Sequence, residues 1–283
     1  MTVTPRTPAA VDALAFEAPI CCLELTVLSV LRLSPGFLRL TLGGPQLREM
    51  DGGGELGPRD LRVKLLVPRP GGSVRPVVDV APGWYPRWLA EDPQQRGEMR
   101  TYTVRAARFD GPLPEIDVDV VLHQPSGPAS DWAAGAAVGD GVVVLGPACG
   151  RLDDHGGIDW ATPAPEEGEV LLVGDETAVP AIGSILETLP AGYRGRALLE
   201  VARCADFLDV RTPADVEVTW LPRCGWPRGD VLLPMLDHVG TPAYAWLAGE
   251  ASVVRRLRRR LVRGGVGRDR IELSGYWREG GPL

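Results

Sequence analysis

A hexapeptide in the first half of the chain, Arg100-Thr101-Tyr102-Thr103-Val104-Arg105, carries side chains that could bind a flavin nucleotide. On a β-strand, residues 100, 102 and 104 lie on one face and the three others lie on the opposite face. A flavin needs a cation near its pyrophosphate, an aromatic surface beside its ring and a hydrogen-bond partner at ring atom N5. The Arg-x-Tyr-Thr order provides all three within one short strand. The alternative is an edge strand in which the arginine is incidental.

A second pattern follows a β-rich run that ends at His123. Gly127 and Pro128 open a helical stretch, and Ser130 falls in its first turn. Free N–H groups and the helix dipole at such a start favour an anion, here a pyrophosphate. Taken alone, the pattern also fits a helix that binds nothing. Because the strand motif precedes it and Gly146-Pro147 follows it, the ordered set favours a flavin site.

The second half of the chain has a weaker candidate for phosphate binding, the turn from Gly174 to Pro180. Rossmann folds hold a pyrophosphate on several glycines after the first strand, whereas this turn has one glycine and two acids. The carboxylates would repel a phosphate, so the residues alone favour a helix start that Asp175 caps. Thr177 and Ala178 are the best candidates for nucleotide contacts in this turn.

Three further features leave alternatives open. Glu250, after Gly249 at another strand end, either caps the next helix or lies near a nicotinamide. Tyr276 and Trp277 either pack against the protein or lie beside a cofactor. The charges after the second strand of the α/β half, which usually distinguish NADH from NADPH, are mixed and decide nothing.

The elements that must position these residues differ between the two halves. Residues 22–150 contain six runs rich in β-branched residues, separated by Gly/Pro turns, which predict a six-stranded antiparallel barrel with one helix near 128–137. Residues 151–169 are rich in glycine, proline and acids and predict a linker. After them, short apolar strands alternate with helices, which predicts a parallel doubly wound α/β sheet.

The sequence therefore predicts a two-domain α+β protein. The expected parts are a flexible leader over 1–20, a flavin-binding β-barrel over 21–152, a linker over 153–168 and a nucleotide-binding α/β domain over 169–283. Ligands of such parallel sheets bind outside the carboxyl ends of the strands.

Charge and hydropathy exclude several classes of protein. The net charge of −7 argues against a nucleic-acid binder. No apolar run approaches the roughly 20 residues of a membrane helix, and the start of the chain lacks a signal-peptide pattern, so we expect a cytoplasmic protein. Six arginines between Arg255 and Arg263 form either the solvated face of a helix or a basic rim for an anionic ligand. Lys64 is the only lysine.

Cysteine and histidine usage predicts no metal centre. The five cysteines form no C-x-x-C pair, and the three histidines are far apart in the sequence. A zinc site or a resident iron–sulfur cluster usually needs closely spaced ligands. An odd number of cysteines also disfavours a disulfide framework.

Five stretches together resemble the siderophore-interacting FAD-binding proteins, a branch of the ferredoxin-reductase superfamily. They span roughly residues 22–280 and read MRTYTVR, VVLHQPSGPASDWAAGAAVGD, LLVGDETAVPAI, AWLAGEASVVRRLRR and SGYWREG. The GDETAVPAI and GYWREG pieces are specific to this branch, whereas R-x-Y-T indicates only the superfamily.

The resemblance implies that FAD lies between the barrel and the nucleotide domain. Arg100, Tyr102, Thr103 and Arg105 would contact its ribityl chain, ring and phosphates, and Trp132 would support the helix after Gly127. The resemblance also implies that the turn after the first α/β strand contacts the nucleotide, and it favours a place for Tyr276 and Trp277 beside the flavin or its adenine. The full expected cofactor-binding set is Arg100, Tyr102, Thr103, Val104, Arg105, His123, Gly127, Pro128, Ala129, Ser130, Trp132, Asp175, Thr177, Ala178, Glu250 and Trp277.

The implied reaction is reduction of an external ferric siderophore. NAD(P)H would pass a hydride to flavin N5, where Thr103 lies, and the flavin would pass electrons to Fe(III), because siderophores hold Fe(II) far less tightly. FAD, not a side chain, would carry the chemistry. Lys64, Arg255 and Arg259 are the candidates for a shallow basic docking surface. We expect a monomer with no nucleic-acid partner and no stable membrane association. The rival hypotheses are a general NAD(P)H:flavin reductase or electron-transfer component, and a non-catalytic siderophore-binding protein.

Overall fold

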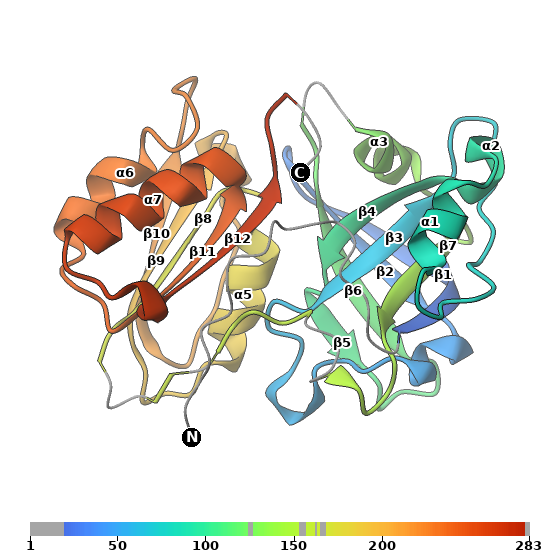
Figure 1. The fold of residues 1–283 in the computed structure, drawn as a ribbon, viewed down its shortest axis with the longest axis horizontal. Helices are drawn as coiled ribbons and strands as arrows, with labels where there is room; N and C mark the ends of the chain where they lie inside the picture. Colours follow the sequence, from blue (N-terminus) through green and yellow to red (C-terminus); the bar gives the residue numbers. More distant parts are fainter. Residues whose placement is uncertain (1–19, 124–126, 153–156, 162, 165–167, 281–283) are drawn as a thin grey trace. The chain divides into compact units, whose positions relative to one another are not determined.

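The computed structural model describes residues 20–123, 127–152, 157–161, 163–164 and 168–280 (Figure 1). The described residues form two compact units, divided between Ile158 and Asp159. Almost all of the expected leader and half of the expected linker lie outside the described residues. Each unit is considered by itself below.

The first unit is built on a seven-stranded antiparallel sheet. Its order is β4-β3-β7-β1-β2-β6-β5, so β4 and β5, which are consecutive in the chain, lie at the two ends of the sheet. The strands are β1 (Ile20–Ser34), β2 (Phe37–Gly43), β3 (Arg62–Val67), β4 (Glu98–Thr103), β5 (Ala106–Arg108), β6 (Glu115–Val121) and β7 (Gly141–Pro147).

Two residues between β4 and β5 curl this sheet into a barrel. The Val104 N–H donates to the Leu61 carbonyl just before β3, and the Arg105 N–H donates to the Asp117 carbonyl of β6, both at 2.8 Å. The chain thus leaves one edge of the sheet and joins the other. The barrel architecture is confirmed, but the expected number of six strands is wrong because one run, residues 99–109, divides at this bend into two strands.

Side chains on a strand alternate between its two faces, so every second residue points into the barrel. These inward-facing residues form the barrel core. Leu23 and Leu25 of β1, Leu40 of β2 and Val63 of β3 belong to this buried cluster. The helix α3 (Pro128–Gly135) adds Ala129 and Ala133 to the same cluster. The predicted helix at 128–137 is confirmed, and it packs against β4 and β6.

The outer face of the barrel carries two short helices that the sequence analysis did not predict. They are α1 (Trp84–Leu89) and α2 (Pro93–Arg96). Trp84 and Trp88 pack against Leu66, Val143 and Leu145, which point away from the barrel interior. Each helix contains a proline and has at most six residues, too few to show a helical period. The 3₁₀ turns of this unit are η1 (Pro45–Glu49) and η2 (Gly54–Leu56).

The second unit is built on a five-stranded parallel sheet. The strand order is β10-β9-β8-β11-β12, so the direction of winding reverses between β8 and β11. This arrangement confirms the expected doubly wound α/β fold and places all strand carboxyl ends at one edge. The strands are β8 (Val170–Gly174), β9 (Arg194–Val201), β10 (Asp215–Pro222), β11 (Tyr244–Glu250) and β12 (Ile271–Trp277).

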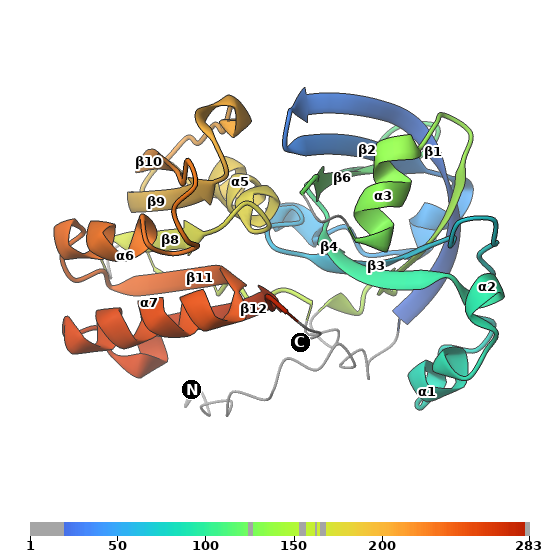
Figure 2. The ribbon, with the colours of Figure 1, turned by 90° about the horizontal axis from the view of Figure 1, so that it is seen from above.

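Helices cover both faces of this sheet (Figures 1 and 2). The helix α5 (Val179–Thr188) lies on one face, and α6 (Leu232–Met235) and α7 (Ala251–Arg263) lie on the other. The helix α6 is short, because Gly229 has a left-handed φ of 80° and turns the chain before it begins. The 3₁₀ turns are η4 (Cys204–Asp206), η5 (Leu236–His238) and η6 (Arg268–Arg270). None of the helices described is long and apolar enough to span a membrane.

Candidate functional site

Strand β4 presents Arg100 and Tyr102 from one face. Tyr102 lies opposite Val63 of β3 and packs at the margin of the barrel core. Burial raises the pKa of its phenol to about 12, so the hydroxyl keeps its proton at neutral pH. The Arg100 side chain is 47% exposed, and its Nη1 donates to the Met99 carbonyl at 2.7 Å and to Glu98 at 3.3 Å. An aromatic ring and an accessible cation therefore lie together on this strand.

The residues at the end of β4 and in the bend after it are more deeply placed. Thr103, Val104 and Arg105 are buried. Arg105 Nε lies 4.0 Å from an Asp119 oxygen, and the same carboxylate accepts two hydrogen bonds from Arg39 at 2.6 and 2.8 Å. Arg105 therefore adds a second positive charge to a carboxylate that Arg39 already binds.

The start of α3 is suited to an anion. Gly127 occupies the N-cap position without a side-chain cap, Pro128 is the first helical residue, and no described atom lies within 4 Å of where a Cβ on Gly127 would stand. The Ser130 hydroxyl donates to the Val121 carbonyl at 3.1 Å, which ties the helix to the end of β6. Trp132 packs against the barrel core, and His123 lies exposed shortly before the helix.

These barrel residues fit FAD. Free N–H groups at a helix start, an exposed arginine and a tyrosine on the adjoining strand are the groups that a dinucleotide with an aromatic ring requires. All of them lie in the first unit. The assignment of each residue to a cofactor atom stays a prediction.

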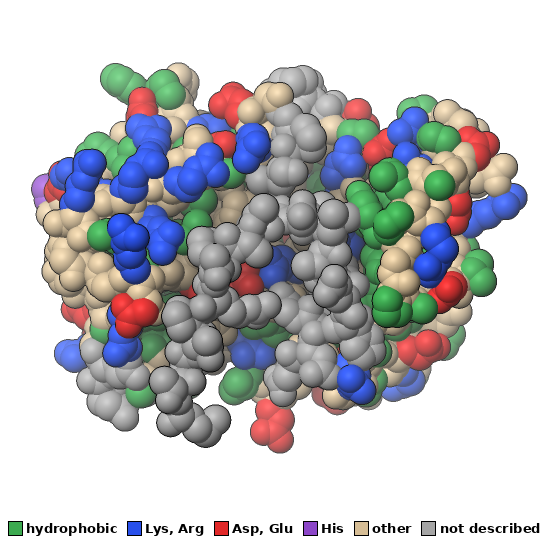
Figure 3. Space-filling model, in the orientation of Figure 1, with side chains coloured by type: hydrophobic (Ala, Val, Ile, Leu, Met, Phe, Trp, Pro, Cys, Tyr) green, Lys and Arg blue, Asp and Glu red, His purple; other side chains and the backbone are tan. Residues whose placement is uncertain are grey.

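The three residues expected to bind substrate have different surroundings. Lys64 is only 7% exposed and donates to Thr101 Oγ1 at 2.7 Å. Burial, with a contribution from Arg62, lowers its pKa to about 8. Its expected place on an exposed surface is wrong, because it lies inside a strand between apolar neighbours. Arg255 and Arg259 are exposed on α7, where basic side chains gather (Figure 3).

In the second unit, the carboxylate of Asp175 connects three segments at the carboxyl edge of the sheet. It accepts hydrogen bonds from the N–H and hydroxyl of Thr177 at 2.9 and 2.5 Å, from the Glu250 N–H at 2.8 Å and from Trp277 Nε1 at 3.0 Å. Burial and the nearby charge of Glu176 raise its pKa. The expected capping of the next helix by Asp175 is wrong, because the N-cap of α5 is Ala178, without a side-chain cap.

Glu250 caps α7, one of the two possibilities that the sequence left open. Its carboxylate accepts from the N–H groups of Ser252 and Val253 at 2.7 and 2.9 Å. Burial alone would raise its pKa, but these hydrogen bonds outweigh burial and lower it. The Asp175 and Glu250 side chains thus bind protein groups, and their contacts to a nucleotide stay predictions.

Sequence analysis missed a cluster of four charged side chains at the same edge. Arg223, just after β10, binds Glu176 through two hydrogen bonds at 2.6 and 3.0 Å and Glu200 of β9 through one at 3.1 Å. Arg228 binds Glu176 at 2.5 Å and lies over the Trp277 ring, 4.6 Å from its centroid. The one sequence signal that could have indicated this cluster was the presence of two arginines, Arg223 and Arg228, in the loop after a predicted strand.

The two acids of this cluster differ in pKa. Burial alone would raise the pKa of Glu176, but the hydrogen bonds and charges of Arg223 and Arg228 outweigh it and lower the pKa. For Glu200 burial prevails and raises the pKa to about 7, although Arg223 and the Gly229 N–H bind its oxygens. Arg223 therefore serves mainly as the counter-ion of Glu176.

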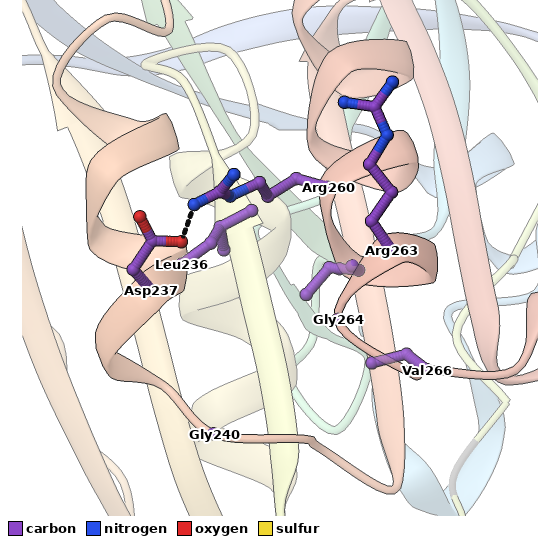
Figure 4. Close-up of a pocket in the computed structure, with 8 residues that line it drawn as sticks. Leu236, Asp237, Gly240, Arg260, Arg263, Gly264 and Val266 are labelled. Atoms are coloured by element: carbon purple, nitrogen blue, oxygen red, sulfur yellow. Dashed lines mark hydrogen bonds and ion pairs between the residues drawn. The ribbon is translucent and has the colours of Figure 1, made fainter.

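A separate pocket of about 280 Å³ lies at the far end of α7 (Figure 4). Arg260, which is paired with Asp237, and Arg263 border it, and Leu236 and Val266 contribute apolar surface. It contains no predicted site residue. Among the described residues, no group of three or more His, Cys, Asp or Glu side chains is placed to hold a metal ion.

Comparisons with known proteins identify the family. Residues 26–151 match the siderophore-interacting FAD-binding domain, and residues 167–280 match the siderophore-interacting protein domain. A relative in Escherichia coli K12, the NADPH-dependent ferric-chelate reductase, is 31% identical over 98% of this chain and 99% of that protein. The chain belongs to the siderophore-interacting protein family. The resemblance inferred from the sequence motifs is thereby confirmed.

Further similar proteins agree with this assignment. The ferric vibriobactin reductase ViuB of Vibrio cholerae is 32% identical over 66% of this chain and 67% of that protein. The crystal structure of a siderophore utilization protein from T. fusca has a TM-score of 0.71 and 32% identity, covering 94% of this chain and 97% of that one. A ferredoxin reductase in carbazole 1,9a-dioxygenase, 16% identical with a TM-score of 0.62 over 92% of this chain and 70% of that one, shares the fold.

Proposed function

We propose that this protein is an FAD-dependent ferric-siderophore reductase that uses NAD(P)H as electron donor. The observation that carries the proposal is the placement of Arg100 and Tyr102 on β4, against which α3 packs, a helix whose start has no side-chain cap. The names of the Escherichia coli and Vibrio cholerae relatives, a ferric-chelate reductase and a ferric vibriobactin reductase, support the substrate class.

The barrel side chains would bind and orient the cofactor. Arg100 and the first N–H groups of α3 would hold the pyrophosphate, because both offer donors to an anion. Tyr102 would lie against the ring, and Thr103 would donate or accept a hydrogen bond at the ring edge. Arg105 and Asp119 would stiffen the strand that carries these groups.

FAD held by Arg100 and the start of α3 would supply the redox chemistry, which is hydride acceptance from NAD(P)H and electron transfer to the Fe(III) of the substrate. The protein supplies position and electrostatics. Because siderophores bind Fe(II) far less tightly than Fe(III), release of the reduced metal needs no iron ligand from the chain.

The proposal assigns the parts of the chain as expected from the sequence. Residues 21–152 would bind FAD and residues 169–283 would bind NAD(P)H, with 153–168 as the linker. The two compact units and the two family domains support this division. A monomer is proposed as well. A cytoplasmic location is supported by the five free cysteines, which suit a reducing compartment.

The proposal is tested with the purified full chain, loaded with FAD. NAD(P)H consumption and Fe(II) capture by a coloured chelator are followed with a ferric siderophore as substrate. Arg100→Ala should weaken FAD binding about 10- to 100-fold, because a charge-assisted hydrogen bond contributes roughly 1.5–3 kcal/mol. Arg87→Ala is the matched control, since Arg87 is an exposed arginine of the same unit that pairs with Asp79.

Two results would contradict the proposal. Equal FAD affinity in Arg100→Ala and in the parent protein would place the cofactor elsewhere. FAD-loaded protein that oxidises NAD(P)H but releases no Fe(II) from any ferric siderophore would favour a general flavin reductase.

A further inference from the structure

The cluster of Glu176, Glu200, Arg223 and Arg228 lies at the carboxyl edge of the parallel sheet, the edge at which doubly wound folds bind a dinucleotide. Its members come from the turn after β8, the end of β9 and the loop after β10. In this fold an acid near the end of the second strand binds the ribose hydroxyls of NAD, and an arginine nearby accommodates the 2′-phosphate of NADP. Both residue types are present here. The solvent exposure of the acid and of the arginines therefore decides whether the site suits NAD or NADP.

Glu200 is not available to a ribose. Its side chain has no exposed surface, and its oxygens accept from the Gly229 N–H at 2.9 Å and from Arg223 at 3.1 Å. Arg223 is likewise buried between Glu176 and Glu200. These two residues therefore form an internal support for the loop after β10.

Arg228 is the accessible cation of the cluster. Its side chain is 24% exposed, one face of the guanidinium covers the Trp277 ring, and Nη1 binds Glu176 at 2.5 Å. A guanidinium held flat by an aromatic ring keeps its N–H edge free to bind an oxyanion through two parallel hydrogen bonds. Glu176 already places one oxyanion, its own carboxylate, against this edge.

We propose that Arg228 binds the 2′-phosphate on the adenosine ribose of NADPH, and that this phosphate replaces the carboxylate of Glu176 at the guanidinium. The inference rests on the proposed function and adds the preference for NADPH over NADH. Glu176 keeps Arg223 as its counter-ion after the exchange, so no buried carboxylate is left unpaired. The phosphate is favoured because it carries a charge of about −1.5 to −2 against −1 for the carboxylate.

The first experiment measures KM for NADPH and for NADH with the FAD-loaded full chain. Arg228→Ala should raise KM for NADPH about 10- to 100-fold, the loss expected for a charge-assisted contact, and change KM for NADH less than about threefold. Glu176→Gln should lower KM for NADPH, because it removes the competing charge. Arg256→Ala is the control, since Arg256 pairs with Asp230 on the flank of α7.

The second experiment does not depend on turnover. Calorimetry measures binding of adenosine 2′,5′-bisphosphate and of 5′-AMP to the same proteins. The parent protein should bind the bisphosphate more tightly, and Arg228→Ala should abolish the difference. If Arg228→Ala does not fold, Arg228→Lys decides, because an ammonium keeps the charge but cannot form the two-bond contact and should retain only part of the preference.

The inference is wrong if the parent protein binds both adenosine nucleotides equally, or if the Arg228 variants weaken NADPH and NADH alike. These failures are distinct from failure of the proposed function. If the proposed function fails, neither NADPH nor NADH will reduce the FAD-loaded protein, or no Fe(II) will appear. Either result is independent of the nucleotide binding that calorimetry measures.

Discussion

The buried carboxylate of Glu200 makes the stability of the second unit depend on pH. Burial raises its pKa from 4.5 to about 7, so between these values the folded protein keeps a proton that the unfolded chain releases. The free energy of unfolding contributed by this group therefore falls as the pH rises through that window. Below pH 4.5 both states are protonated and the penalty vanishes.

Glu200→Gln should remove this dependence. Relative to the parent protein, the variant should gain about 2–3 kcal/mol in free energy of unfolding between pH 5 and pH 8, since each pKa unit corresponds to about 1.4 kcal/mol. Urea unfolding at several pH values measures the difference. Glu217→Gln, an exposed glutamate on the adjacent strand β10, should show no such trend. If the free energies of unfolding of Glu200→Gln and of the parent protein differ by the same amount at every pH, the Glu200 carboxylate does not have the raised pKa.

Single residues differ in how far sequence alone could place them. The alternation of a strand was enough to put Arg100 and Tyr102 on one face. The pairing of Arg223 with Glu176 joins residues 47 positions apart, and no local pattern encodes it. Lys64 was misplaced for a related reason, because the usual rule that lysines are exposed is overridden by the apolar strand that contains it.

The elements at the carboxyl edge of the parallel sheet are joined through the close approach of Asp175 to Gly249. Gly249 has a φ of 138°, and a Cβ there would stand 2.7 Å from the carboxylate carbon of Asp175. This approach lets the carboxylate reach the Glu250 N–H at the start of α7 and the indole of Trp277 at the end of β12. The hydrogen bonds that join this turn to α7 and β12 thus require a residue without a side chain at position 249.

Gly249→Ala should therefore destabilise the protein by about 3 kcal/mol or more, from the strained φ and the clash together. Gly265→Ala is the matched control, because Gly265 also has a positive φ, 97°, but no atom lies within 4 Å of its would-be Cβ. The control should lose only about 1–2 kcal/mol. Thermal or urea unfolding measures both, and equal losses would mean that the contact with Asp175 is unimportant.

At the scale of elements, the strong periodic patterns were predicted and the irregular joints were not. The alternation of apolar strands and helices after residue 169 predicted the parallel sheet, because the strands and the helices α5 and α7 are long enough to show their periods. The bend at Val104 and Arg105 has no sequence signature, since both residues suit a strand. It arises because the barrel closes where one chain segment leaves its pairing with β3 and joins β6 at the other end of the sheet.

The whole molecule combines a net charge of −7 with a concentrated basic surface on α7. Arg255, Arg259 and Arg263 follow one another at every fourth position and are exposed, and no acidic side chain of the described residues pairs with them. Arg256 and Arg260, by contrast, pair with Asp230 and Asp237. Like charges at this spacing weaken a helix slightly, so the row is not explained by the stability of α7.

We expect this row to raise the rate at which an anionic ferric siderophore meets the protein. Reversing two charges, Arg255→Glu with Arg259→Glu, should lower kcat/KM for an anionic ferric catecholate several-fold at low salt. The effect should disappear near 1 M salt, where the Debye length is only about 3 Å. A neutral ferric hydroxamate should react equally fast with both proteins, and Arg211→Glu, an exposed reversal elsewhere in the same unit, should have little effect. A loss that persists at high salt would mean that these arginines contact the bound substrate directly, and no loss at any salt would leave the basic surface without a role in this reaction.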